Sequence, residues 1–210
     1  MQNDKLELLD EVASYYSKKL ALHGETPNGV DWNGEQGQAL RFEQLCKIIN
    51  DPQAFSIGDL GCGYGALVDY LNKQCHSFSY LGIDVSSDMI NVAKQRYAKM
   101  QAARFITASE PDSLMDYIVA SGIFNVRLGR SDAEWRAYLE NTLDVMDKAS
   151  RYGFAFNCLT SYSDEDKKRD DLYYSDPCLL FDLCKRRYSR QVALLHDYGL
   201  YEFTILVRKT

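Results

Sequence analysis

The sequence lacks the features that mark a membrane-spanning or exported protein. No apolar run approaches the roughly 20 residues that a helix needs to cross a bilayer, and no basic segment followed by an apolar one stands at the N-terminus. Only 4 of the 210 residues are proline, and no linker rich in proline, glycine or serine divides the chain. We therefore expect a cytoplasmic protein with one structural domain that buries a full core.

Positive charge and metal-ligand patterns are also scarce. The chain has 24 Lys and Arg against 30 Asp and Glu, a net charge of −6 at pH 7, whereas proteins that bind nucleic acid usually present a basic face. None of the six cysteines forms a Cys-x-x-Cys pair, and the three histidines do not lie at zinc-ligand spacing near them. We expect free thiols, no metal, and neither nucleic acid nor membrane as a partner, with the oligomeric state open.

From residue 55 onward, strand-like and helix-like patterns alternate. We predict strands over residues 55–60, 79–84, 104–108, 117–120, 152–157, 192–196 and 202–207, and helices over 66–74, 88–100, 132–148 and 177–188. This alternation indicates a parallel sheet with helices on both faces. The last two strands are joined too tightly for a crossover helix, so the last strand must be antiparallel. The fold class is α/β: a doubly wound, seven-stranded, mostly parallel sheet.

The first 50 residues precede this alternating region. Helical spacing predicts helices over residues 6–22 and 38–49, and the glycine-rich stretch 23–37 between them reads as a loop. We expect residues 1–50 to form an N-terminal helical cap, or lid, over a Rossmann-like core of residues 51–210.

A glycine-rich turn follows the first predicted strand of the core. It reads Asp59-Leu60-Gly61-Cys62-Gly63-Tyr64-Gly65, and a helix begins after it. Glycines let the backbone approach a ligand closely, and a helix N-terminus offers free N–H groups. Together with Ala66 the glycines also fit the dinucleotide pattern G-x-G-x-x-[GA], which alone is a weak signal. We expect Asp59, at the end of its strand, to stay solvated near a cationic ligand.

A second acid lies at the end of the next strand. Asp84 follows Gly61 by 23 residues in the segment Tyr80-Leu81-Gly82-Ile83-Asp84. Its two oxygens can accept hydrogen bonds from both hydroxyls of a ribose.

With these residues the chain resembles the class I S-adenosylmethionine-dependent methyltransferases from about residue 55 to the C-terminus. Asp-x-Gly-x-Gly-x-Gly is the signature of that family. The loop with His23-Gly24, Pro27 and Gly29-Val30-Asp31-Trp32-Asn33, together with the end His196-Asp197-Tyr198-Gly199-Leu200-Tyr201-Glu202-Phe203-Thr204, resembles a group of small bacterial methyltransferases. The resemblance implies S-adenosyl-L-methionine as cofactor and S-adenosyl-L-homocysteine as product. The cofactor contacts that we predict are Asp59, Gly61, Cys62, Gly63, Gly65, Asp84, Val85, Met89, Ser109, Ser121 and Gly122. Met89 is equally well read as a core residue, and the Gly-Asp pair common after the third strand of the family is absent here.

The methyl acceptor is expected beyond the carboxyl ends of the strands and under the cap. A histidine at a strand end can take up a proton, so we predict His196 as a catalytic residue. Asn125 follows the fourth strand, where it can meet a polar acceptor, and we predict it as a second catalytic residue. The predicted substrate contacts are Tyr16, Trp32, Arg41, Arg127 and Tyr173. Each of these also has a purely structural interpretation.

We accordingly expect methyl transfer to oxygen or nitrogen of a small polar metabolite or natural-product intermediate. One alternative is a protein or RNA methyltransferase, although the fourth strand lacks the Asn/Asp-Pro-Pro-Tyr/Phe run of many such enzymes. A second alternative is a non-catalytic subunit that binds the cofactor within a complex.

Overall fold

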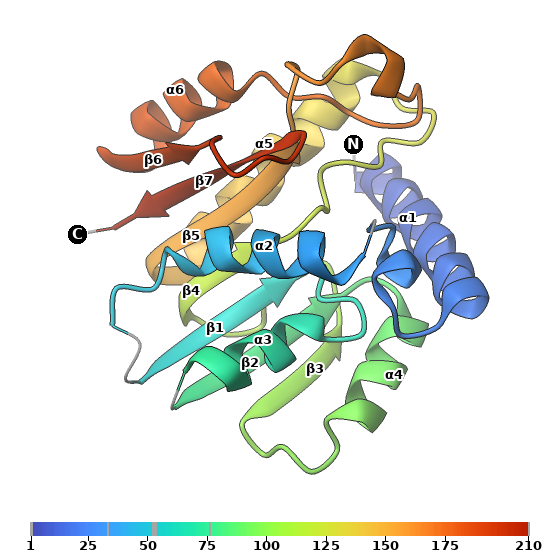
Figure 1. Ribbon diagram of the computed structural model, residues 1–210, viewed down its shortest axis with the longest axis vertical. Helices are drawn as coiled ribbons and strands as arrows, with labels where there is room; N and C mark the ends of the chain where they lie inside the picture. The colour runs from blue at the N-terminus through green and yellow to red at the C-terminus, as the bar shows by residue number, and fades with distance from the viewer. Residues whose placement is uncertain (1, 33, 52–53, 76, 210) are drawn as a thin grey trace.

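One seven-stranded sheet, in the order β3-β2-β1-β4-β5-β7-β6, forms the centre of the molecule (Figure 1). The computed structural model describes residues 2–32, 34–51, 54–75 and 77–209. The strands are β1 (Phe55–Leu60), β2 (Phe78–Asp84), β3 (Ala103–Thr107), β4 (Met115–Ala120), β5 (Ser150–Leu159), β6 (Gln191–Leu195) and β7 (Glu202–Arg208). The α-helices are α1 (Gln2–His23), α2 (Glu35–Cys46), α3 (Ala66–Gln74), α4 (Ser87–Arg96), α5 (Asp132–Ala149) and α6 (Pro177–Arg187), and short 3-10 turns span η1 (Pro27–Val30) and η2 (Glu165–Lys167).

The strand directions confirm the predicted fold class. Strands β1 to β5 pair in parallel, and β7 runs antiparallel to both β5 and β6. The loop predicted over residues 23–37 is shorter than expected. It contains the turn η1, and α2 already begins at Glu35 because Gly34, with φ 108°, turns the chain into the helix.

Strand β4 illustrates how the two layers of the core are filled. Tyr117 and Val119 pack with α2 and α3 on one face, whereas Ile118 and Ala120 pack with α5 on the other. Figure 1 shows α2 and α3 on the near face of the sheet and α5 on the far face. Successive side chains of a strand point to opposite faces, so both faces of this central strand are buried and its sequence is almost entirely apolar.

Side-chain caps fix where the helices begin, next to the carboxyl ends of the strands. The Oγ of Ser86 accepts the N–H of Met89 at 3.2 Å at the start of α4, and Ser131 forms a capping box with Glu134 at the start of α5. The N-terminal helix α1 lies beside α4 (Figure 1), where the hydroxyls of Ser17 and Ser86 are 2.9 Å apart. Helix α1 is therefore anchored near the carboxyl ends of the strands, where a ligand is expected.

Within the described part of the chain, no helix is both long and apolar enough to cross a membrane.

The close packing around Gly82 in β2 yields a stability prediction. A Cβ at Gly82 would lie 2.5 Å from Cδ1 of Phe105 and 2.9 Å from Sγ of Cys62. Gly82→Ala is expected to lower the free energy of unfolding by about 1–3 kcal/mol through overpacking, measured by urea denaturation. Gly129→Ala is the matched control, because nothing lies within 4 Å of its Cβ position, and it should change the stability by less than about 0.5 kcal/mol. Equal effects of the two variants would contradict this account of the packing.

Candidate active site

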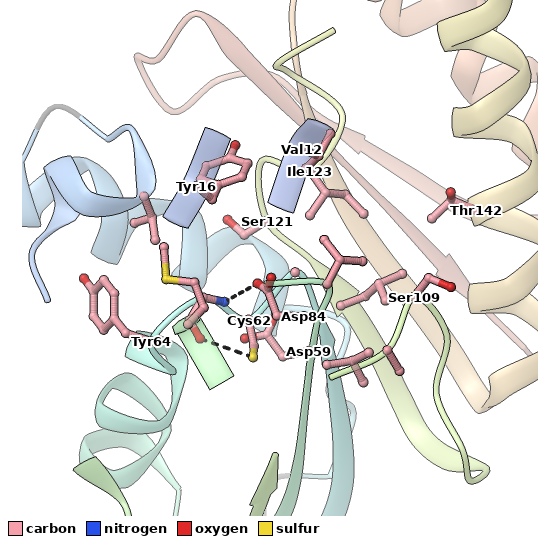
Figure 2. Close-up of a pocket in the computed structure, with 18 of the residues that line it drawn as sticks. Val12, Tyr16, Asp59, Cys62, Tyr64, Asp84, Ser109, Ser121, Ile123 and Thr142 are labelled. Atoms are coloured by element: carbon pink, nitrogen blue, oxygen red, sulfur yellow. Dashed lines mark hydrogen bonds between the residues drawn. The ribbon is translucent and has the colours of Figure 1, made fainter. Parts of the chain in front are cut away.

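A cavity lies at the carboxyl end of the sheet, between the glycine turn and the cap formed by α1 and η1. It encloses about 1060 Å³ of space outside protein atoms, including solvent at its mouth. Its lining from the core includes Asp59, Leu60, Gly61, Cys62, Gly63, Tyr64, Ala66, Ile83, Asp84, Val85, Met89, Ala108, Ser109, Ser121, Ile123, Tyr138, Thr142 and Val145. Residues 1–50 also contribute to the lining. Leu9, Val12, Tyr16, Val30 and Trp32 come from α1, η1 and the loop before α2, and Gln38 and Phe42 come from α2. Figure 2 shows Val12 and Tyr16 on the opposite side of the cavity from Asp59 and Asp84.

The glycine turn is held in place by the end of β2. The carbonyl of Ile83 accepts the N–H groups of Gly61 at 2.8 Å and of Cys62 at 3.0 Å. The N–H of Gly63 donates to Oδ2 of Asp84 at 2.8 Å, one of the bonds drawn in Figure 2. Gly61 has φ 76°, and a Cβ there would lie 2.1 Å from Cγ2 of Ile123, so a side chain at this position would both strain the turn and collide with Ile123 in the cavity wall.

Asp84 fastens the turn and still faces the cavity. Its Oδ1 accepts the N–H of Ser86 at 2.9 Å, while Oδ2 accepts Gly63. Burial raises the pKa of this carboxyl, and the backbone N–H groups of Ser86, Gly63 and Val85 oppose that shift. A carboxylate has about four acceptor positions, so these backbone groups still leave Asp84 able to accept a hydroxyl group of a ligand.

Asp59 differs from its predicted environment. We expected a solvated carboxylate, but the residue is only 4% exposed. Burial raises the pKa of Asp59 to about 7, while the hydroxyl of Tyr80, which donates to Oδ2 at 2.7 Å, lowers it. The prediction of solvation was wrong because the side chain turns inward at the end of β1, although Asp59 does line the cavity.

Ser121 carries an unpaired polar atom in the wall of the cavity. Among the described residues, its buried Oγ has no hydrogen-bond partner. A buried hydroxyl without a partner costs free energy unless a ligand or water satisfies it. Ser121 therefore fits a position that contacts a polar ligand.

The structure brings many of the predicted site residues together at this one cavity. The predicted cofactor residues that line it are Asp59, Gly61, Cys62, Gly63, Asp84, Val85, Met89, Ser109 and Ser121, and the predicted substrate residues that line it are Tyr16 and Trp32.

The face of α5 that lines the cavity was missed. Tyr138, Thr142 and Val145 lie there at spacings of four and three residues, a single helical face. Burial raises the pKa of the Tyr138 phenol to about 12, so it stays protonated and can donate a hydrogen bond. The sequence carried one signal for this face, namely two hydroxyl side chains where a core-facing stripe would be apolar.

The two predicted catalytic residues lie away from the lining. The Oδ1 of Asn125 accepts the backbone N–H of Leu159 at 3.1 Å, and Asn125 itself is buried. His196 is exposed, and its ring packs against the rings of Tyr162 and Phe203. The amide of Asn125 therefore holds the loop after β4 against the end of β5, and the imidazole of His196 faces the outer surface.

Three of the predicted substrate residues also lie outside the lining. Arg127 is paired with Asp132 and donates to the carbonyl of Asp170. Tyr173 packs against the core cluster on the α5 side of the sheet. Arg41 forms a buried ion pair with β7, as described below.

Two predicted cofactor glycines stand just behind the cavity wall. Gly65 begins α3, and the space at its Cβ position faces the rings of Tyr97 and Phe105. Gly122 is covered by the indole of Trp32, which is itself part of the lining.

Metal ligands do not gather anywhere in residues 2–32, 34–51, 54–75 and 77–209, where no group of three or more His, Cys, Asp or Glu side chains could hold an ion.

Comparisons by sequence agree with this geometry. The family described as "Methyltransferase domain" matches residues 59–149. The chain is 63% identical over 163 residues to the Mycobacterium tuberculosis protein named "Putative methyltransferase Rv1506c", which covers 78% of this chain and 98% of that protein. It is also 32% identical over 107 residues to the trans-aconitate 2-methyltransferase of Afipia carboxidovorans, covering 45% of this chain and 40% of that enzyme.

Comparisons by structure show the same fold. The N-methyltransferase NodS of Bradyrhizobium japonicum, solved with S-adenosyl-L-homocysteine, has a TM-score of 0.64 at 18% identity and covers 94% of this chain and 97% of that one. The DhpI-SAM-HEP complex has a TM-score of 0.64 at 14% identity and covers 97% of this chain and 98% of that one.

The raised pKa of Asp59 predicts how stability depends on pH. The folded protein holds a proton on Asp59 up to about pH 7, whereas the unfolded chain loses it near pH 4. The folded state therefore binds more protons between these values, and stability falls as the pH rises from about 4 to 7. The free energy of unfolding is measured by urea denaturation at pH 5 and at pH 8. Asp59→Asn should reduce the difference between the two values by an amount on the order of 2–4 kcal/mol, and a smaller difference should remain because of Asp84.

Asp112→Asn is the control for this experiment. The pairing with Arg104 lowers the pKa of Asp112 to about 2, so this group does not titrate in the same range. The decline between pH 5 and pH 8 should be unchanged in Asp112→Asn. An unchanged decline in Asp59→Asn would show that the buried carboxyl does not carry it.

Proposed function

The chain belongs to the S-adenosylmethionine-dependent methyltransferases of class I, and from this premise we propose that it methylates oxygen or nitrogen of a small molecule enclosed in the cavity. The observation that carries the proposal is a continuous cavity, which joins the glycine turn and Asp84 to the cap and to α5. We place the cap in residues 1–50 and the core in residues 51–210, and we assign the protein to the cytoplasm.

The residues of the cavity fit the cofactor. Asp84 is still able to accept a hydroxyl group of the ribose, and the buried Oγ of Ser121 lacks a partner that a polar ligand can supply. A Cβ at Gly61 would lie 2.1 Å from Cγ2 of Ile123, so only glycine lets the turn pack against this residue of the cavity wall. Val85 and Met89, which line the cavity, would give an apolar surface to the adenine, and Ser109, two residues beyond β3, would supply a polar contact. Asp84, and Asp59 once it has lost its proton, favour the cationic groups of the cofactor.

The bound cofactor supplies an electrophilic methyl group on its sulfonium. The protein's own part is to align the acceptor, since methyl transfer is an in-line displacement that depends on orientation. Tyr16, Tyr138 and Thr142 line the cavity and carry hydroxyl groups, which we expect to orient an acceptor by hydrogen bonds. The hydroxyl of Thr142 already donates to the carbonyl of Tyr138 at 2.8 Å, so its part is that of a hydrogen-bond acceptor. Because His196 and Asn125 lie outside the lining, we propose that alignment and not a histidine base carries the reaction.

The charge of the lining restricts the acceptor class. Among the described residues that line the cavity none is Lys, Arg or His, and the charged ones are Asp59 and Asp84. An acceptor carboxylate would be buried there without a cationic partner and near two acids, which is unfavourable. We propose an acceptor that is uncharged or carries an amine, in contrast to the tricarboxylate named for the Afipia relative.

Binding of the cofactor product tests the first part of the proposal. Titration calorimetry should show S-adenosyl-L-homocysteine binding to the whole chain, and Asp84→Asn should weaken it by at least about tenfold through loss of a charged acceptor. Asp88→Asn is the matched control, because Asp88 is an exposed acid in the first turn of α4 outside the cavity lining. Tight binding of NAD instead of S-adenosyl-L-homocysteine would overturn the cofactor assignment.

Transfer from labelled S-adenosyl-L-methionine tests the acceptor class. A panel of small amines, neutral alcohols, phenols and carboxylates of matched size should give methylated amine or hydroxyl products, with carboxylates at least about tenfold slower. His196→Ala should retain wild-type turnover, since its ring lies on the outer surface. Preferred methylation of carboxylates would contradict the proposed acceptor, and transfer only in the presence of a partner protein would favour the alternative of a cofactor-binding subunit.

A further inference from the structure

A chain of polar and aromatic contacts links the last strand of the sheet to the wall of the cavity. It joins Trp32, Arg41, Gly122, Asn157 and Glu202, which come from the loop before α2, from α2, from the turn after β4, from β5 and from the first residue of β7. We call these five residues the Glu202 network. Its members are up to 170 residues apart in sequence, from 32 to 202, and they meet just behind the cavity wall.

Glu202 is the branch point of this network. The guanidinium of Arg41 binds its carboxylate in a forked geometry, with Nη2 at 2.6 Å from Oε1 and Nε at 2.9 Å from Oε2. The amide Nδ2 of Asn157 donates to Oε2 at 3.0 Å, and the amide Oδ1 of Asn157 accepts the backbone N–H of Gly122 at 2.7 Å. One buried carboxylate thus reaches both a residue of α2 and the backbone of the turn that follows β4.

The Glu202 network is so deeply buried that a gain in folding free energy does not by itself explain it. The side chain of Glu202 is 1% exposed and that of Arg41 is 11% exposed, and Asn157 is fully buried. Removing two charges from water is costly, so a buried pair often adds little net stability. A forked arginine–carboxylate pair does, however, fix direction, because its two parallel hydrogen bonds allow one orientation. The network is therefore better explained by what it positions.

The part that it positions is the indole of Trp32. The guanidinium carbon of Arg41 lies 3.9 Å from the centroid of the indole ring, a cation–π contact. Elsewhere the indole lies against Gly122, where a Cβ would be 2.3 Å from Cζ2 and 2.5 Å from Cη2. The ring is held between the arginine and the backbone of a residue that must be glycine. Both of these contacts are themselves fixed by Glu202, one through Arg41 and the other through Asn157.

Trp32 and Ser121, which directly precedes Gly122, both line the cavity. We propose that Glu202 is a positioning residue for methyl transfer, which acts through Arg41 and Asn157 to set the wall formed by Trp32 and Ser121. Arg41 accordingly serves the site through the indole and not by touching the acceptor. This inference rests on the proposed function, since the wall matters only if the cavity binds the cofactor and its acceptor.

The test uses the whole protein labelled with 5-fluorotryptophan and observed by ¹⁹F NMR. The chain has two tryptophans, Trp32 and Trp135, and Trp32→Phe assigns their resonances. Trp135 is 1% exposed and donates to the carbonyl of Phe124, so its resonance reports the integrity of the fold. Glu202→Gln should shift or broaden the Trp32 resonance and leave the Trp135 resonance in place. The reason is that a glutamine amide cannot accept from Arg41 and from Asn157 at once without placing two donors against each other.

Arg41→Lys is the second variant, because lysine keeps the charge but loses both the fork and the flat face that stacks on the indole. It should also shift the Trp32 resonance and leave the Trp135 resonance in place. If Glu202→Gln also loses the Trp135 resonance, that variant has lost its fold, and Arg41→Lys then tests the network in its place. Arg104→Lys is the matched control, since Arg104 makes a forked pair with the exposed Asp112. It should change neither resonance.

Affinity for S-adenosyl-L-homocysteine, measured on the same samples, separates a positioning role from a structural one. Glu202→Gln should weaken binding about tenfold and Arg104→Lys less than about twofold. The inference is overturned if the Trp32 resonance is unchanged in both network variants, or if it moves while the affinity stays the same. If the wild-type protein binds no S-adenosyl-L-homocysteine, the proposed function fails, and an unshifted Trp32 resonance in the free variants would independently refute the network.

Discussion

The carboxyl end of β2 holds the glycine turn, and the rest of the site depends on this attachment. The carbonyl of Ile83 accepts two N–H groups of the turn, and Asp84 accepts a third from Gly63. These bonds fix the turn against a strand that is itself locked between β1 and β3. Because the turn is pinned through its backbone, its open side remains free to face a ligand. The floor of the cavity is thus a product of the sheet, and the cap needs only to close over it.

The site combines this rigid floor with groups that are unfavourable in the absence of a ligand. Asp59 and Asp84 are two acids at one cavity, and burial raises the pKa of both. The Oγ of Ser121 is buried without a partner among the described residues. A ligand that brings positive charge and hydrogen-bonding groups relieves each of these costs. Within the cap, Asp31 ties the segment after η1 to α1, because it pairs with Lys19 and accepts the hydroxyl of Tyr15. The hydroxyls of Ser17 in α1 and Ser86 beside α4, 2.9 Å apart, join the cap to the core. The unfavourable groups are therefore enclosed together, as expected for a binding site.

The sequence predicted the architecture well because the signals for it are local. Hydrophobic periods gave the strands and helices, and the missing crossover before β7 gave the antiparallel strand. The sequence also pointed to the glycine turn and Asp84, which do lie at the cavity, because the signal for them is a backbone shape set by adjacent residues. The environment of Asp59 was not predictable, because solvation depends on which way a strand-end side chain turns. Arg41 and Glu202 stand 161 residues apart, and no local pattern relates them.

A crystal structure of the protein with S-adenosyl-L-homocysteine tests the central claim most directly, namely that the glycine turn and Asp84 form the cofactor site of a methyltransferase. The account predicts the ligand in the cavity between β1, β2 and the cap. At least one ribose hydroxyl should lie about 3 Å from the Asp84 carboxylate, and the sulfur beside Ser121. A ligand bound at another surface, or one whose ribose does not meet Asp84, would contradict it.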